Sequence, residues 1–158
     1  MIDFLATYMG KVISTFVVAM VPVIELRGAI PWAVAQGLDI WSASIISIVG
    51  NMVPVPFIIV FIRKIFELMR KISPKLNGVV TKMQNKAEKH RETVNRYKFW
   101  GLLILVAIPL PGTGAWTGAL VAAMMEMRLK DAIPSIFFGV VVAATVVAMV
   151  TCGVTILI

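Results

Sequence analysis

Two ionisable residues of opposite charge, Glu25 and Arg27, lie two positions apart within the apolar stretch VPVIELRGAI at 21–30. A carboxyl group can take up and release a proton, and desolvation favours its uncharged form. A guanidinium presents a planar fork of N–H donors that grips phosphate or carboxylate groups. Pro22 and Gly28 flank the two charges and interrupt regular helix. These residue types therefore suit a site that exchanges protons and holds an anionic group.

The chain around this pair has the composition of an integral membrane protein. Of its 158 residues 59% are apolar, and the mean hydropathy is +0.93, whereas soluble domains are roughly 45–50% apolar. Residues 99–125 and 132–158 form long apolar runs. About 20 apolar residues in a helix cross the bilayer core, which is about 30 Å thick. We therefore expect an all-α integral membrane protein.

The net charge of +7 is concentrated in one segment. Residues 63–98 carry eleven Lys or Arg and three Glu, a net of +8, and the rest of the chain nets −1. Basic loops between membrane segments face the cytoplasm, so we expect a cytoplasmic linker and no nucleic-acid partner. Apolar residues recur within it at helical spacing, which predicts an amphipathic helix on the anionic inner leaflet. An ordinary solvated helix is the alternative.

Two halves of the chain repeat the same order of features. When Lys11 is placed over Lys98, Pro22 falls over Pro109, with ten residues between lysine and proline in each half. Three more pairs match after a one-residue slip and a later three-residue insertion: Gly28 with Gly114, Ala43 with Ala132, and Gly50 with Gly139. The two halves are therefore predicted to be structural repeats.

The lengths of the repeated pieces predict how each half meets the membrane. Ten helical residues rise about 15 Å, half of the hydrocarbon core of about 30 Å. Each short helix should therefore turn back near the bilayer centre, which makes a re-entrant hairpin. We expect repeat one at 1–62, with a hairpin at about 12–37 and a transmembrane helix at about 40–62. Repeat two, at 99–158, has its hairpin at about 99–125 and its transmembrane helix at about 132–158.

Opposite orientation of the two repeats follows from the basic segments. The linker 63–98 and the link 126–131, with Arg128 and Lys130, both belong inside. Hairpin two then enters from the cytoplasm and hairpin one from outside, which is an inverted-topology repeat. In the alternative topology, residues 2–20 form a complete spanning helix with a cytoplasmic N-terminus.

Opposed hairpins offer a site near the bilayer centre, as in many secondary transporters. Charges at that depth cost about 2.5–3.5 kcal/mol each on insertion scales, so they persist where they pair or line a wet cavity. The predicted substrate and proton site comprises Glu25, Arg27, Gly28, Asn51, Pro109, Pro111, Gly112, Thr113, Gly114 and Thr117. In the alternative, Glu25 and Arg27 only pair with each other and hold the hairpin turn.

Catalytic and metal-binding patterns are absent from the sequence. Cys152 and His90 are the only cysteine and histidine and lie far apart, and no phosphate loop or nucleophile motif is found. We therefore expect no enzyme, no cofactor and no metal.

Two crossings and two hairpins form a small shell around a polar site, which favours a homodimer or higher homo-oligomer.

The stretches PVIELRGAIP at 22–31 and IPLPGTGAWTGALVA at 108–122 resemble the signature of the small multidrug export protein family. The resemblance covers nearly the whole chain, and it implies a multi-pass transporter of the cell (inner) membrane that exports small amphipathic compounds. That family resembles, at a distance, the DedA-type membrane proteins. The DedA-type relatives imply proton-coupled flipping of an anionic lipid such as a polyprenyl phosphate. A membrane assembly protein without a substrate is the third alternative.

Residues of the DedA-type pattern match this chain only in part. The pattern has an acidic residue in hairpin one, which Glu25 matches. It has arginines in hairpin two, whereas this chain has none there and carries Arg27 in hairpin one.

Overall fold

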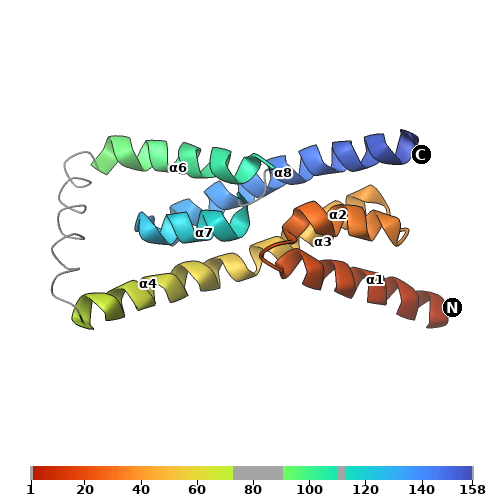
Figure 1. Ribbon diagram of the computed structural model, residues 1–158, viewed down its shortest axis with the longest axis horizontal. Helices are drawn as coiled ribbons and strands as arrows, with labels where there is room; N and C mark the ends of the chain where they lie inside the picture. Colours follow the sequence, from red (N-terminus) through yellow and green to blue (C-terminus); the bar gives the residue numbers. More distant parts are fainter. Residues whose placement is uncertain (1, 73–90, 110–112, 158) are drawn as a thin grey trace.

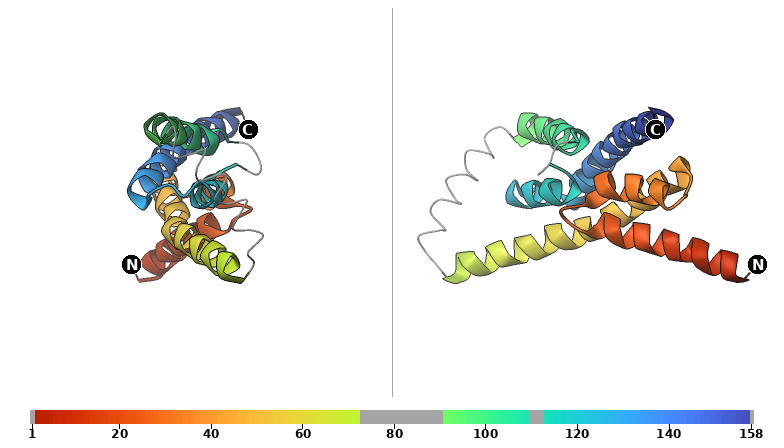
Figure 2. Two further views of the ribbon diagram at one scale, coloured as in Figure 1. Left: turned by 90° about the vertical axis from the view of Figure 1, so that its left-hand side faces the viewer. Right: turned by 45° about the vertical axis from the view of Figure 1, so that its right-hand side comes forward.

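The computed structural model describes residues 2–72, 91–109 and 113–157, and this part of the chain contains helices and no strand. Figure 1 shows the helices arranged along one long axis, with both termini at the same end, as Figure 2 also shows. In chain order the helices are α1 (Ile2–Met20), α2 (Glu25–Ala35), α3 (Ile40–Met52), α4 (Pro54–Ile72), α6 (Arg91–Ala107), α7 (Ala115–Met124) and α8 (Leu129–Leu157).

Helices α1 and α2 form the first helical hairpin. α1 runs from the N-terminus to the middle of the long axis, and α2 returns toward the same end (Figure 1). The turn between them is residues 21–24, which include Pro22. Glu25, the first residue of α2, has a φ of 50°, a left-handed conformation that is uncommon outside glycine. The hairpin tip is therefore tight, and the backbone is strained at Glu25.

Helices α6 and α7 form the second hairpin, which points the opposite way. α6 comes from the far end to the middle of the long axis and α7 returns to that end (Figure 1). Gly114, directly before α7, has a φ of 152°, a backbone conformation open essentially to glycine alone. The tips of both hairpins thus meet in the middle of the fold.

Two apolar segments run past both hairpins. One is Ile40–Ile65, formed by α3 and α4, and the other is Leu129–Val154 in α8; both are long and apolar enough to cross a membrane. α3 and α4 meet at Val53, directly before Pro54, because proline cannot donate the backbone hydrogen bond that would continue α3.

Small residues let the hairpins pack closely against the long segments. α1 and α2 pack on α3, while α6 and α7 pack on α8. A Cβ added at Gly50 of α3 would lie 2.7 Å from the Phe16 carbonyl oxygen, and one at Gly139 of α8 would lie 2.8 Å from the Leu103 carbonyl oxygen. Alanine or any larger residue at either glycine would therefore push two helix backbones apart.

Several helix boundaries differ from the predicted ones. α1 extends back to Ile2 and α6 back to Arg91, whereas helices starting near Lys11 and Lys98 were predicted. Lysine favours helix and its long stem lets the charge reach polar surroundings, so a lysine does not end a helix. The 19 residues of α1 have the length required by the alternative topology.

The predicted amphipathic linker helix can be followed only at its two ends. α4 continues through Ile72, and α6 begins at Arg91, so residues 63–72 and 91–98 are helical. The centre of the predicted helix, residues 73–90, lies outside the described residues.

Candidate functional site

The carboxylate of Glu25 lies against the first turn of α7, in the other hairpin. The Glu25 side chain is buried, with 4% of its surface exposed. The backbone N–H of Trp116 donates a hydrogen bond to Glu25 Oε1 at 3.3 Å. A Cβ at Gly114 would overlap this carboxylate, so glycine at that position lets the carboxylate approach the helix end.

Glu25 acts as an N-terminal cap supplied from another element. The first N–H groups of a helix have no partner within the helix and carry partial positive charge, which an acidic group stabilises. Gly114, at the N-cap position of α7, has no side chain that could accept a hydrogen bond. Glu25 therefore satisfies one of these N–H groups, and it brings negative charge to the positive end of α7.

Arg27 makes the complementary contact with the end of α6. Its Nη2 donates to the carbonyl oxygen of Ile108 and to the hydroxyl of Thr113, both at 3.0 Å. The Thr113 hydroxyl donates to the same Ile108 oxygen at 2.7 Å. The last carbonyl groups of a helix carry partial negative charge, so the guanidinium stabilises the end at which α6 stops.

Trp116 adds a contact in the reverse direction. Its indole Nε1 donates to the carbonyl oxygen of Met20 at 3.2 Å, at the C-terminal end of α1. Each hairpin thus satisfies polar groups at the helix ends of the other. We call this set of Glu25, Arg27, Ile108, Thr113 and Trp116 the hairpin contact.

The structure brings together four of the predicted site residues and separates others. Glu25, Arg27, Thr113 and Gly114 belong to or adjoin the hairpin contact. The remaining positions are Gly28 within α2, Pro109 exposed beside Ile108, Thr117 half-buried in α7, and Asn51 fully buried in α3. The predicted residues Pro111 and Gly112 lie outside the described residues.

Glu25 and Arg27 lie in the first turn of α2, which the sequence did not predict, although Glu25 itself has a left-handed φ of 50°. Non-helical backbone was expected at ELRG, with a helix starting near Gly28. Instead α2 begins at Glu25, and the Gly28 N–H donates to the Ile24 carbonyl oxygen at 3.0 Å. An acidic side chain such as Glu25 is favoured in the first turn of a helix, whereas Arg27 has its partner at the C-terminal end of α6.

Sequence reasoning missed two partners in the contact, Trp116 and Ile108. Trp116 was not among the predicted site residues, and the Ile108 contact uses a backbone carbonyl, which side-chain patterns do not reveal. A usable signal was present for Trp116, because an indole two residues after Gly114 can donate a hydrogen bond into the gap between the tips.

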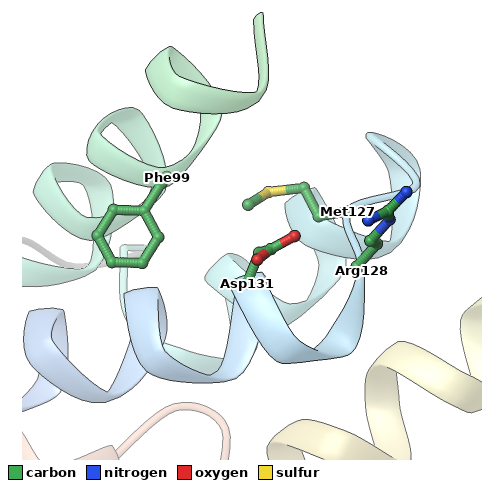
Figure 3. A pocket seen from close by; sticks show the side chains of 4 residues that line it. All are labelled: Phe99, Met127, Arg128 and Asp131. Carbon is green, nitrogen blue, oxygen red and sulfur yellow. The ribbon is translucent and has the colours of Figure 1, made fainter. Parts of the chain in front are cut away.

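Two hollows lie away from the hairpin contact. One is a cavity of about 140 Å³. Figure 3 shows the four side chains that line it, Phe99, Met127, Arg128 and Asp131. An open apolar groove of about 580 Å³ lies between α3 and α8, and its lining includes Met52 and Phe137. No residue of the predicted site lines either hollow.

Comparison with models of protein families shows which family this chain belongs to. The family model described as "Putative small multi-drug export protein" matches residues 25–146, which is most of the chain. The chain belongs to this family. The match begins at Glu25 and includes all five residues of the hairpin contact together with α3, α4, α6 and α7.

Membership of the small multidrug export family agrees with the two long apolar segments, Ile40–Ile65 and Leu129–Val154. Both observations indicate a membrane protein, and the description of the family implies a transporter rather than an enzyme. No curated protein and no solved structure matches the chain significantly.

Proposed function

We propose that this chain is a proton-coupled exporter of small amphipathic compounds, with its transport site at the hairpin contact. The observation that carries the proposal is the buried Glu25 carboxylate, held in one hairpin and hydrogen-bonded to the N-terminus of α7 in the other. A group that can change its charge thus lies where the two helical hairpins meet.

The hairpins are proposed to be re-entrant and to belong to two inverted repeats, 1–62 and 99–158, joined by the linker 63–98. Matching contacts support this. Lys98 Nζ donates to the Met125 carbonyl oxygen at the end of α7, and Lys11 Nζ lies beside Gly37 at the end of α2. The contacts of Gly50 with α1 and of Gly139 with α6 match in the same way.

Burial favours a revised pairing of the repeats at the hairpin tips. Glu25, Leu26, Ala29, Ile30 and Ala33 are buried in hairpin one, and Gly114, Ala115, Gly118, Ala119 and Ala122 are buried with the same spacing in hairpin two. We therefore pair Glu25 with Gly114, in place of Gly28 with Gly114. These two paired residues touch, as residues beside a pseudo-two-fold axis must.

In this arrangement the hairpin contact lies near the middle of the cell (inner) membrane, which the chain crosses more than once. The basic linker 63–98 is cytoplasmic, and Asp39 faces the opposite side. The length of α1 is compatible with either a tilted, partly external helix or the complete crossing of the alternative topology.

Proton exchange at Glu25 would open and close the hairpin contact. An ionised carboxylate accepts a stronger hydrogen bond than a neutral carboxyl does, and only the ionised form has full negative charge for the positive end of α7. Uptake of a proton therefore weakens the contact and frees the tips. A cationic amphipathic compound can neutralise Glu25 instead of the proton, which makes proton and compound alternative occupants of one site.

Arg27 favours a second candidate function, the flipping of an anionic lipid such as a polyprenyl phosphate. Its guanidinium and the Thr113 hydroxyl, 3.0 Å apart, are both groups that bind phosphate. In this alternative the lipid phosphate displaces the Ile108 carbonyl oxygen from Arg27. A homodimer or higher homo-oligomer is proposed for either function, because it would enclose a hairpin tip that is otherwise exposed to lipid.

Transport by the purified chain in proteoliposomes tests the proposal and separates the two functions. Tetraphenylphosphonium is the cationic probe and undecaprenyl phosphate the anionic lipid probe. We expect a pH gradient to drive tetraphenylphosphonium movement, and a Glu25→Gln variant to abolish that response. Movement of undecaprenyl phosphate alone would favour the flippase, and movement of neither would favour a membrane assembly protein without a substrate.

A further inference from the structure

Two polar side chains in α3 are buried without a hydrogen-bond partner among the described residues. Ser47 and Asn51 each have 0% of their surface exposed. Ser47 Oγ and both side-chain atoms of Asn51, Oδ1 and Nδ2, make no hydrogen bond there. The two residues lie four positions apart and thus on one face of the helix. Three unsatisfied polar atoms are therefore gathered on a single buried face.

The hydroxyl group of Ser47 lacks the hydrogen bond that four other hydroxyl-bearing residues of α1, α3 and α8 make. Thr15, Ser44, Thr145 and Thr151 each donate to the carbonyl oxygen four residues earlier. This is the usual way in which a helix satisfies a buried hydroxyl group. Ser47 does not make that bond, so its hydroxyl group remains available to a partner outside its own helix.

Repeat two lacks this polar pair at the corresponding positions, a comparison that rests on the repeat pairing of the proposed function. Gly50 pairs with Gly139, so Ser47 pairs with Ile136 and Asn51 with Val140. Ile136 and Val140 are likewise 0% exposed. Apolar side chains thus fill the equivalent space in α8, and packing alone does not require polar residues in α3.

Neighbouring contacts connect the polar pair to the hairpin contact. Gly50, next to Asn51, packs against Ala19. The next residue of α1, Met20, accepts the hydrogen bond from the indole of Trp116. Asn51 also lies two residues before Val53, where α3 ends and α4 begins. A change at the hairpin tips can therefore reach the face that carries the pair, beside a break at which α3 can move.

We propose that Ser47 and Asn51 are a binding site for an uncharged hydrogen-bonding group of the transported compound, exposed when the hairpin contact opens. Buried polar atoms without partners are unfavourable, and a second conformation that gives them partners removes that penalty. The Asn51 amide offers a donor and an acceptor side by side. Its complement is a hydroxyl or amide group, since a bare cation would leave Nδ2 without an acceptor.

Cysteine labelling tests the opening of this site without requiring transport. Asn51→Cys and Val140→Cys are made separately in a Cys152→Ser background and treated in proteoliposomes with a charged methanethiosulfonate reagent, between pH 5 and pH 8. Position 51 should react, and its rate relative to that of a free thiol at the same pH should rise as the pH falls, because the thiolate fraction of any cysteine itself decreases. Position 140 should stay unlabelled. Ser47→Cys is a second, nearly isosteric probe of the same face. If positions 47 and 51 remain as unreactive as position 140, the proposal is overturned.

Ligand binding tests the chemical class. Chloramphenicol is uncharged and carries an amide and hydroxyl groups, whereas tetraphenylphosphonium has no hydrogen-bonding group. A Ser47→Ala, Asn51→Val variant should bind chloramphenicol about tenfold more weakly, as expected from losing a buried hydrogen bond, and tetraphenylphosphonium unchanged. Equal effects on both probes, or no chloramphenicol binding to the unaltered chain, would overturn this ligand class. The labelling result rests on the proposed opening of the hairpin contact, whereas chloramphenicol binding needs no proton gradient, so failure of this ligand class is distinguishable from failure of proton-driven transport.

Discussion

The carboxylate of Glu25 in α2 accepts a hydrogen bond from the backbone N–H of Trp116 in α7, so that a residue of one hairpin caps the N-terminus of a helix in the other. The distance of 3.3 Å is slightly beyond the usual range of about 2.7–3.2 Å for such bonds. Arg27 binds the other helix of hairpin two, so both charges of ELRG act between the hairpins.

Gly114→Ala should disrupt the hairpin contact from the side of hairpin two. The added Cβ would overlap the Glu25 carboxylate, and alanine disfavours the φ of 152°. We expect a loss of about 1–3 kcal/mol of stability from the backbone conformation alone, measured by thermal unfolding in detergent. Gly101→Ala is the matched control, because no atom lies within 4 Å of its added Cβ. That change should stabilise α6 by roughly 0.5–1 kcal/mol, and an equal loss at both glycines would contradict the assignment.

Arg27→Ala should destabilise the contact through the end of α6. It removes the donor to Ile108 and Thr113, and hydrogen bonds from a charged group contribute about 1.5–3 kcal/mol. Arg27→Lys should retain part of this stability, because lysine keeps the charge but lacks the planar fork. Thr113→Val removes only the hydroxyl and should have a smaller effect on the unfolding temperature. A Thr113→Val loss as large as that of Arg27→Ala would show that the hydroxyl, not the guanidinium, holds the end of α6.

The double variant Glu25→Gln, Arg27→Gln distinguishes two roles for these charges. Either each side chain binds hairpin two, or Glu25 and Arg27 form an ion pair that interacts only with itself. If the two charges served only each other, removing both would restore the stability lost in either single variant. Each side chain has its own partners in hairpin two, so we expect the double variant to unfold at a lower temperature than either single variant. Recovery of stability in the double variant would support the simpler hairpin clasp.

Asp39 should make stability depend on pH at the start of α3. It is the N-cap residue, and the backbone N–H of Ser42 donates to its Oδ2 at 2.9 Å, which lowers the pKa of Asp39 below its ordinary value. A lowered pKa in the folded state means that this stabilisation is complete above the ordinary aspartate pKa of about 3.9. It is lost as the pH falls through the lower folded-state value.

Asp39→Asn is the variant that isolates this effect. Asparagine caps helices as well as aspartate does but does not titrate. The variant should therefore keep α3 intact at neutral pH and lose less stability than the unaltered chain between about pH 4 and pH 2. Identical acid unfolding curves for both proteins would contradict the role assigned to the Asp39 carboxylate.

The membrane character could be predicted from sequence, because it follows from the composition and the long apolar runs. The length of α6 could not, since Lys98 was treated as a helix end, and the length of α1 agrees only with the alternative in which residues 2–20 form one helix. The partner of Glu25 could not be predicted either. It is a backbone N–H in Trp116 that becomes accessible only because Gly114 has no side chain.

Asn51 illustrates a different limit of sequence reasoning. It was assigned to the site as a polar residue within an apolar helix, and it is buried on the face shared with Ser47. The lack of a partner for either side chain within the described residues depends on how α3 packs against its neighbours. No spacing rule could have predicted that packing.

The distance between the two hairpin tips as a function of pH tests the central claim most directly. Spin labels at Val23 and Ile104, both exposed, are introduced through cysteines in a Cys152→Ser background, and their separation is measured in lipid between pH 8 and pH 5. The distance should lengthen as the pH falls, because protonation of Glu25 weakens its bond to α7. In Glu25→Gln it should be long at every pH. A distance that stays constant with pH in the unaltered chain, or that still changes in Glu25→Gln, would contradict control of the hairpin contact by Glu25.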